Sequence, residues 1–189
     1  MLFPTLFDKH LRKPKNIIPH GGETVYYGEV FDEEDADRLY ELLLRETPWR
    51  KDEWVIYNKI YLTPRKVAWY SIKRGGVPRE LSKMKKLVES YTGVTYNHVL
   101  LNLYENGEIG LGWHSDKESW EENSSIASVS LGAERRFDFR HVETKETISM
   151  VLEHGSLLVM QGLLQNYWKH HLPKCKHVKH PRINLTFRK

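Results

Sequence analysis

The pattern of apolar and polar residues predicts two amphipathic helices in the first half of the chain. Asp32 is a suitable N-cap, and the leucines that follow at helical spacing form an apolar face that ends near Thr47. A second helix follows Pro78, because apolar residues recur at helical spacing until Gly93, a typical helix stop. We expect both helices to serve as scaffold rather than as active site.

The other apolar runs are short and rich in β-branched and aromatic residues, which favours strands. The expected strands span residues 54–57, 59–62, 99–104, 109–116, 125–131, 136–140, 148–152, 156–160 and 182–188. Because short strands recur without intervening helices after residue 94, we expect a sandwich, barrel or jelly roll. Residues 8–20 contain four Lys or Arg and two prolines, so we expect an extended basic arm rather than a packed element.

Composition then limits the class of protein. The 189 residues include 29 Lys and Arg against 25 Asp and Glu, a formal net charge of +4, and 40% are hydrophobic, which argues against global disorder. No stretch reaches the ~20 apolar residues of a membrane span, and Pro4 and Asp8 interrupt the start too early for a signal peptide. The single Cys175 excludes an internal disulfide and fits a reducing, intracellular setting.

The segment His114-Ser115-Asp116 is the first candidate for chemistry. Residues two apart in a strand project to one face, so this imidazole and this carboxylate can converge on one point. With a distant second histidine they would form the facial triad of non-haem iron(II) oxygenases. Alone, such a pair is more often a polar surface pair, so other segments must support the assignment.

Support comes from residues 182–188, which alternate strictly between polar and apolar positions. The polar positions are Arg182, Asn184, Thr186 and Arg188. A surface strand would explain this face, but two arginines and an asparagine also suit a dicarboxylate, because guanidinium groups bind carboxylates through two hydrogen bonds. Asn102 and Tyr104 share a face in the same way. Together these residues could line one barrel interior with a metal and an anionic cosubstrate.

In this order, these segments resemble the AlkB family. The matching segments are Asn102-Leu103-Tyr104, His114-Ser115-Asp116, a later histidine-bearing segment and Pro181-Arg182-Ile183-Asn184-Leu185-Thr186-Phe187-Arg188, together with residues 125–132 and 153–160. The resemblance covers about residues 60–189 and is greatest to the branch that acts on DNA. It implies an Fe(II)- and 2-oxoglutarate-dependent dioxygenase that uses O2 to remove alkyl groups from nucleic-acid bases.

The resemblance also implies the fold: mainly β with flanking helices (α+β), built on a double-stranded β-helix, or jelly-roll, core. Residues 1–93 would hold an N-terminal extension, the helices and a nucleotide-recognition region. Residues 94–189 would form the catalytic core, within one compact domain overall.

By this resemblance, His114, Asp116 and His170 are the iron ligands and the catalytic centre. Residues 167–173 resemble the family's distal-histidine motif, and the match falls on His170, with His171 as the competing ligand. Another alternative is a zinc site built from His171, Cys175, His177 and His180. Its spacing fits no common zinc pattern.

The resemblance further assigns 2-oxoglutarate to the arginine-rich strand. Arg182 and Arg188 would bind its carboxylates, with Arg188 forming a salt bridge to the distal one. Further contacts to the cosubstrate are expected from Asn102, Tyr104 and Asn184.

The implied reaction is oxidative demethylation of bases such as 1-methyladenine and 3-methylcytosine in DNA, with release of formaldehyde, succinate and CO2. A base inside a duplex must be flipped out to be reached. Glu118 would favour a cationic base, with a solvated acid as the alternative, and Arg65 is a candidate DNA contact. Trp69 or Tyr70 would stack on the base, with core packing as the alternative for either.

Two other classes remain open: a 2-oxoglutarate oxygenase acting on RNA, protein or a small molecule, and a non-enzymatic nucleic-acid-binding module. The second does not explain the triad together with the arginine-rich strand. The partner is expected to be single- or double-stranded alkylated DNA, with RNA as an alternative, and no membrane is expected. We also expect a monomer, cytoplasmic if the source is bacterial and nuclear if it is eukaryotic.

The placement of charge supports a nucleic-acid substrate. Glu153 is the last acidic residue, so the segment after it is basic, whereas acidic residues concentrate in 32–53 and 116–122. This distribution predicts a basic rim suited to phosphates beside an acidic pocket suited to iron and a cationic base.

Overall fold

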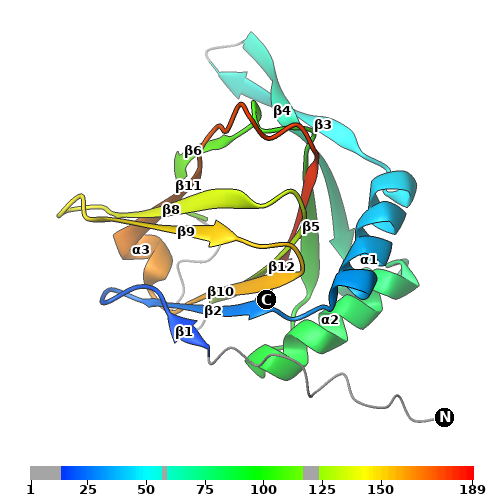
Figure 1. Cartoon of the computed structure of the whole chain (residues 1–189), viewed down its shortest axis with the longest axis horizontal. Coiled ribbons are helices and arrows are strands. Elements are labelled where there is room, and N and C mark those ends of the chain that lie inside the picture. The colour runs from blue at the N-terminus through cyan, green and yellow to red at the C-terminus, as the bar shows by residue number, and fades with distance from the viewer. Residues whose placement is uncertain (1–13, 57–58, 117–123) are drawn as a thin grey trace.

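The computed structural model describes residues 14–56, 59–116 and 124–189, which form two facing antiparallel sheets with the two long helices on one side (Figure 1). The strands are β1 (Lys15–Asn16), β2 (Glu23–Glu29), β3 (Arg50–Ile56), β4 (Lys59–Ser71), β5 (His98–Tyr104), β6 (Leu111–His114), β7 (Ser125–Gly132), β8 (Arg135–His141), β9 (Thr147–Leu152), β10 (Ser156–Gln161), β11 (Trp168–Leu172) and β12 (Arg182–Arg188). The helices are α1 (Glu33–Glu46), η1 (Ile72–Arg74), α2 (Arg79–Thr92) and α3 (Leu164–Tyr167).

The two sheets differ in size. The large sheet has the order β1-β2-β10-β7-β12-β5-β4-β3, and the small sheet has the order β6-β11-β8-β9. They curve toward each other around a common interior, and the β3–β4 hairpin extends beyond them at the top of Figure 1. This arrangement confirms the expected mainly β, jelly-roll fold.

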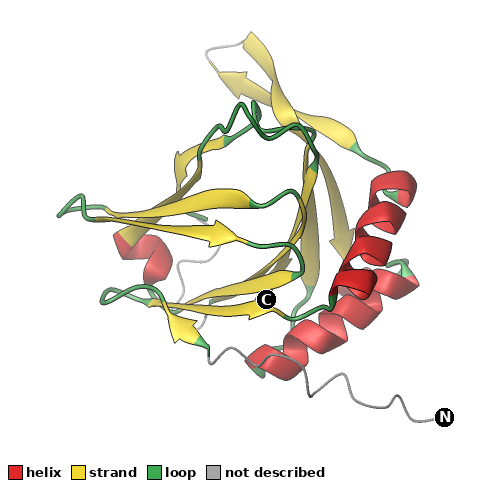
Figure 2. Cartoon of the chain, in the orientation of Figure 1, coloured by secondary structure: helices red, strands yellow, loops and turns green. Residues whose placement is uncertain are grey.

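Both predicted helices are present where the sequence pattern places them. The Asp32 side chain accepts a hydrogen bond of 2.8 Å from the backbone N–H of Asp35, which caps α1. Helix α2 ends at Gly93, whose φ of 67° lies in the left-handed region that glycine adopts without strain. The two helices lie together against the outer face of the large sheet (Figure 2).

Strand β12 lies in the middle of the large sheet, paired with β5 on one side and β7 on the other. Its apolar residues Ile183, Leu185 and Phe187 are buried in the hydrophobic cluster under α1 and α2. The helices thereby occupy one face of the strand, and the polar residues face the interior between the sheets. The surface-strand interpretation of residues 182–188 is therefore wrong.

Several expectations need correction. The described part of the basic arm is extended and mostly exposed, as expected, but Lys15–Asn16 pairs with β2 and Ile18 is buried, so the arm is attached to the sheet. The strand expected over 109–116 is shorter and ends at His114. The sequence pattern does not predict strands β1, β2 and β11 or the short helices η1 and α3.

The N-terminal region and the core share one sheet. Strand β2 pairs with β10, and β4 pairs with β5. The division into 1–93 and 94–189 stays a prediction. None of the helices within the described ranges is long and apolar enough to cross a membrane.

Candidate metal and cosubstrate site

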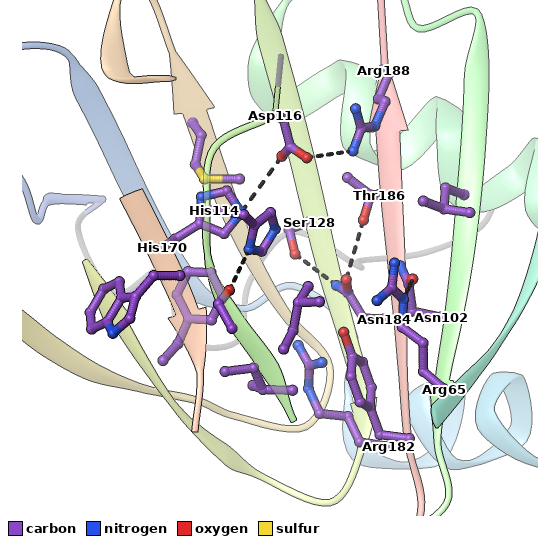
Figure 3. A pocket seen from close by; sticks show the side chains of 18 residues that line it. Arg65, Asn102, His114, Asp116, Ser128, His170, Arg182, Asn184, Thr186 and Arg188 are labelled. Carbon is purple, nitrogen blue, oxygen red and sulfur yellow. Dashed lines mark hydrogen bonds and ion pairs between the residues drawn. The ribbon is translucent and has the colours of Figure 1, made fainter. Parts of the chain in front are cut away.

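A cavity of about 360 Å³ lies between the two sheets and gathers most of the predicted site residues (Figure 3). Its volume is in the range of small-molecule sites. The predicted residues that line it are Arg65, Asn102, Tyr104, His114, Asp116, His170, Arg182, Asn184 and Arg188. They come from both sheets, so only the folded barrel brings them together.

The three predicted metal ligands converge at one end of this cavity. One donor atom each from His114, Asp116 and His170 lies within 4.8 Å of the other two. His114 is the last residue of β6 and pairs directly with His170 on β11, which places their ring centroids 4.1 Å apart. Two imidazoles and one carboxylate on a common point are the donor set that suits iron(II) with open positions.

Hydrogen bonding prepares His114 for a metal. Its Nδ1 lies 2.8 Å from the carbonyl oxygen of Gly112. A carbonyl can only accept, so Nδ1 carries the proton and Nε2 keeps its lone pair for a metal.

His170 is held neutral by its surroundings. Burial lowers the pKa of His170 to about 3, the neighbouring His114 and Arg188 act in the same direction, and Asp116 opposes them. A neutral imidazole is the form that binds a metal, so no proton has to be displaced at physiological pH.

Asp116 lies between Arg188 and the two histidines (Figure 3). Its Oδ1 accepts a hydrogen bond of 2.9 Å from Arg188 Nη2, and its Oδ2 lies 3.7 Å from His170 Nε2. Burial alone would raise the pKa of Asp116, but Arg188, His170 and His114 outweigh it and lower the pKa below its usual value. The side chain is therefore a carboxylate, the form that binds a metal.

The alternative ligands lie elsewhere. His171 projects from the opposite side of β11, where it stacks on Trp113 at 4.7 Å and lies 3.6 Å from Asp138. Cys175 contacts His177 at 3.2 Å. Across residues 14–56, 59–116 and 124–189, the triad is the only group of three or more potential metal ligands, so the zinc alternative has no support.

Arg182 forms the opposite end of the cavity. It is 2% exposed, its Nη2 donates to Ser130 Oγ at 2.9 Å, and its guanidinium lies 5.6 Å from the centroid of the Tyr104 ring. Burial lowers the pKa of Arg182 to about 10, Tyr104 opposes this shift and Arg135 adds to it. No carboxylate of the described chain pairs with Arg182, and its Nε has no hydrogen-bond partner there.

A buried guanidinium without a carboxylate is costly unless an anion compensates it. Arg182 and Arg188 are six residues apart on β12, so their backbones are separated by ~20 Å. The metal ligands lie at the Arg188 end. This geometry suits a dicarboxylate with one end near the metal and the distal carboxylate at Arg182, and we propose this placement in place of the salt bridge expected from Arg188.

Asn102 and Asn184 differ in which of their amide groups remain available to bind a ligand. Asn102 Oδ1 accepts from Arg65 Nε at 2.9 Å, which leaves the donor group of the amide for the cavity. Asn184 Nδ2 donates to Ser128 Oγ at 2.7 Å, and its Oδ1 accepts from Thr186 Oγ1 at 3.2 Å. Both ends of the Asn184 amide are thus engaged with the protein, and its contact to the cosubstrate stays a prediction.

The two candidate stacking residues lie on opposite faces of β4. Trp69 pairs with the cavity residue Leu100, stacks on His98 at 5.3 Å and is 44% exposed. Tyr70 packs against the hydrophobic cluster under the helices. Of the two, only Trp69 is on the cavity side of the sheet. Glu118 lies outside the described residues.

Sequence reasoning missed three residues that shape this site. Ser130 and Ser128 hold Arg182 and Asn184, and Gln165 accepts a hydrogen bond of 2.9 Å from the backbone N–H of Asp116. The serines alternate on the expected strand over 125–131, so the period of that strand could have identified them. Nothing in the local pattern around Gln165 indicates its role.

Comparisons with solved structures agree on the fold. The structure of OsALKBH1 superposes with a TM-score of 0.63 at 15% identity, covering 93% of this chain and 99% of that chain. A 2OG-Fe(II) oxygenase family oxidoreductase from Burkholderia pseudomallei gives a TM-score of 0.59 at 16% identity, covering 87% and 84%. At these identities the likeness concerns the fold alone.

Sequence comparisons are more specific. The bovine alpha-ketoglutarate-dependent dioxygenase alkB homolog 3 is 35% identical over 83% of this chain, which spans 62% of that protein's length. The human protein of the same name is 33% identical over 98% of this chain and 72% of its own length. Human DNA oxidative demethylase ALKBH2 is also 33% identical, over 86% of this chain and 72% of its own length.

Residues 23–188 match the 2OG-Fe(II) oxygenase superfamily. This match confirms the expected class of enzyme and its requirement for Fe(II), 2-oxoglutarate and O2, for which the triad and Arg182 provide suitable binding groups. The identities to the mammalian proteins narrow the assignment further. The chain belongs to the AlkB family within the 2OG-Fe(II) oxygenase superfamily.

Proposed function

We propose that this protein oxidatively demethylates N-alkylated bases in DNA, with 1-methyladenine and 3-methylcytosine as substrates. The reaction would consume 2-oxoglutarate and O2 and release succinate, CO2 and formaldehyde. The relatives named as DNA oxidative demethylases support DNA as the substrate.

One observation carries the proposal. The same cavity has a His-Asp-His set at one end and, at the other, a buried arginine that no described carboxylate neutralises. A redox metal and a dicarboxylate can therefore bind in one chamber. A nucleic-acid-binding module without catalysis would need neither group.

Each side chain has a distinct task in this reaction. Bound iron(II) and 2-oxoglutarate supply the activated oxygen that hydroxylates the alkyl group. His114, Asp116 and His170 would hold the iron, and Arg182 would hold the distal carboxylate. Arg188 binds the carboxylate of Asp116 and lowers its pKa, so Asp116 stays ionised and keeps its negative charge for the metal.

Asn102 is the best candidate for a neutral contact to the cosubstrate. The amide oxygen of Asn102 accepts the hydrogen bond from Arg65, so the amide N–H groups of Asn102 are available as donors to an anionic oxygen in the cavity. Arg65 comes from β4, the strand that also carries Trp69. A nucleic-acid contact of Arg65 itself would use its remaining guanidinium donors.

The base would be recognised from the β4 side of the cavity. The indole of Trp69 is exposed and stacks on His98, whereas Tyr70 packs against the hydrophobic core. Trp69 is therefore the better candidate for stacking on a base. Glu118, two residues after the ligand Asp116, remains our candidate for favouring a cationic base.

Phosphates would contact the outer face of the small sheet. Lys169 and Arg140 lie directly opposite each other on β11 and β8, and no acid within the described residues forms an ion pair with either. Like charges at such positions are unfavourable unless an anion binds them. Arg140 also lies 4.0 Å over the ring of Trp113, a residue that lines the cavity, so this basic face adjoins the site.

The test is turnover of defined oligonucleotides. The protein is incubated with Fe(II), 2-oxoglutarate and DNA containing one 1-methyladenine or 3-methylcytosine, and formaldehyde, succinate and the mass of the base are measured. We expect one formaldehyde per methyl group lost. Matched single-stranded and duplex DNA, and the same sequence as RNA, rank the substrates.

The outcomes separate the alternatives. Succinate release without loss of the methyl group from any oligonucleotide would point to an oxygenase with another substrate. Oligonucleotide binding without succinate or formaldehyde would leave only the binding module. Either result overturns the proposal.

A further inference from the structure

Asp116 is a candidate metal ligand that no strand of the sheet holds. Strand β6 ends at His114, so the ladder between β6 and β11 that aligns His114 with His170 stops before Asp116. Two side chains hold Asp116 instead. Arg188 binds its carboxylate, and Gln165 binds its backbone N–H.

Gln165 is itself rigidly placed. It is 4% exposed and belongs to α3, a short helix between β10 and β11 at the left of Figure 1. The adjacent Leu164 is buried in another hydrophobic cluster, which also contains Trp168 and Met160. This packing anchors the helix. Gln165 therefore has little freedom to follow Asp116 if that residue moves.

The orientation of the Gln165 amide is defined by its partners. Oε1 accepts from the N–H of Asp116 at 2.9 Å, and Nε2 faces the sulfur of Met160 at 3.8 Å. A backbone N–H requires an acceptor, so the oxygen must face Asp116. A reversed amide would oppose two donors and leave the buried N–H of Asp116 without a partner.

We propose that Gln165 is a positioning residue for the metal: by fixing the backbone of Asp116 it directs the carboxylate toward His114 and His170. Gln165 lies five residues before His170, so one short segment carries one ligand and aligns another. The proposal rests on the metal site of the proposed function. It extends that site to a residue that contacts no metal and no substrate.

The test measures metal affinity in the full chain without 2-oxoglutarate or nucleic acid. Co(II) serves as the probe, because it is stable in air on the time scale of a titration and its absorption reports the ligand geometry. Gln165→Leu removes the acceptor at similar side-chain volume, and we expect it to weaken Co(II) binding by about 10- to 100-fold, the usual effect of losing an outer-shell partner. Gln165→Glu retains an oxygen at the same distance and should recover part of this loss.

Gln161→Leu is the matched control. Gln161 lies at the end of β10, four residues earlier, and its Nε2 is 3.5 Å from Ser125 Oγ, away from the ligands. It should bind Co(II) as the wild type does. Thermal unfolding of the apo proteins separates a loss of metal affinity from a loss of fold.

If Gln165→Leu does not fold, Gln165→Asn replaces it, because the shorter side chain keeps the amide but withdraws the oxygen. A folded variant of either kind with wild-type Co(II) affinity and spectrum overturns the inference. If the wild type itself does not bind Co(II), the metal site fails and the proposed function fails with it. These two results are distinguishable in the same titration.

Discussion

The two ends of the cavity are built in different ways. At the cosubstrate end, Arg182 belongs to β12, which is hydrogen-bonded to a neighbour on both sides along its whole length. At the metal end, His114 is the last residue of a four-residue strand, and Asp116 lies beyond it. The backbone ladder thus positions Arg182, the proposed cosubstrate arginine, whereas side chains position Asp116, the proposed metal-binding carboxylate.

This difference has a consequence for mutagenesis. A substitution of Arg182 should remove one contact and leave the neighbouring residues in place, because the ladder maintains the strand and Arg182 binds no candidate metal ligand. A substitution around Asp116 should displace a ligand that the sheet does not hold. We therefore expect separable effects at the cosubstrate end and coupled effects at the metal end.

The largest effect is expected from a metal ligand. His170→Ala removes one of three ligands, so metal affinity should fall by more than the ~100-fold that loss of an outer contact can cost, and formaldehyde release should become undetectable. Co(II) titration and the oligonucleotide assay measure the two quantities. His171→Ala is the control and should stay active, since His171 stacks on Trp113 and does not itself line the cavity. If His170→Ala were active and His171→Ala inactive, His171 and not His170 would be the metal ligand.

The next effect concerns the cosubstrate end alone. Arg182→Ala removes the buried cation, and truncating one partner of a buried charged pair costs enough to raise the KM for 2-oxoglutarate by ~30-fold or more. Succinate release as a function of 2-oxoglutarate concentration measures it, and Co(II) affinity should not change. Ser130→Ala removes only the hydroxyl that accepts a hydrogen bond from Arg182 and leaves the cation in place, so it should raise the KM less, by about fivefold. An unchanged KM in Arg182→Ala would contradict our placement of the distal carboxylate.

Arg188 tests whether the metal end is coupled. Because Arg188 holds the carboxylate of Asp116, Arg188→Ala should weaken Co(II) binding by about 10-fold and also weaken binding of 2-oxoglutarate. Titrations of the two ligands on the same protein check this directly. Arg182→Ala is the matched variant on the same strand. If Arg188→Ala changed only the affinity for 2-oxoglutarate and left Co(II) affinity unchanged, Arg188 would not position Asp116 and the metal end would not be coupled.

The smallest effect is expected at the rim. Trp69→Ala should raise the KM for a methylated oligonucleotide by ~10-fold, the usual cost of losing one base–aromatic stack, while the KM for 2-oxoglutarate stays the same. Tyr70→Ala serves as the comparison, because Tyr70 packs in the core and its loss should lower thermal stability instead. Equal oligonucleotide KM values for wild type and Trp69→Ala would exclude stacking by this residue.

Much of the fold follows from local patterns. Helices α1 and α2 were predicted with their caps, and the strict alternation of residues 182–188 correctly separates the core face of β12 from its polar face. Strand β11 was missed although Trp168, His170 and Leu172 alternate as buried residues. His170 hides the alternation of apolar and polar residues, because a polar histidine occupies a buried position where a strand pattern requires an apolar residue.

The burial of the polar face of β12 could not be predicted from the strand itself. An alternating strand is compatible with solvent or with a barrel interior on its polar side. The small sheet, which closes over this face, depends on the pairing of β11 with β6 and β8, strands that are distant in sequence. Long-range contacts therefore decide between a surface strand and a cosubstrate site.

The sequence by itself determined the chemistry available to this protein: the ligand types of the metal site, the arginines of β12 and their shared face, all of which depend on residue identity and strand period. Only the tertiary structure decided the direction of the cavity, with Arg188 beside the metal and Arg182 at the far end. It also decided that Gln165 supports Asp116 after the strand ends. The physical reason is that both depend on distances between segments far apart in the chain, which no local periodicity encodes.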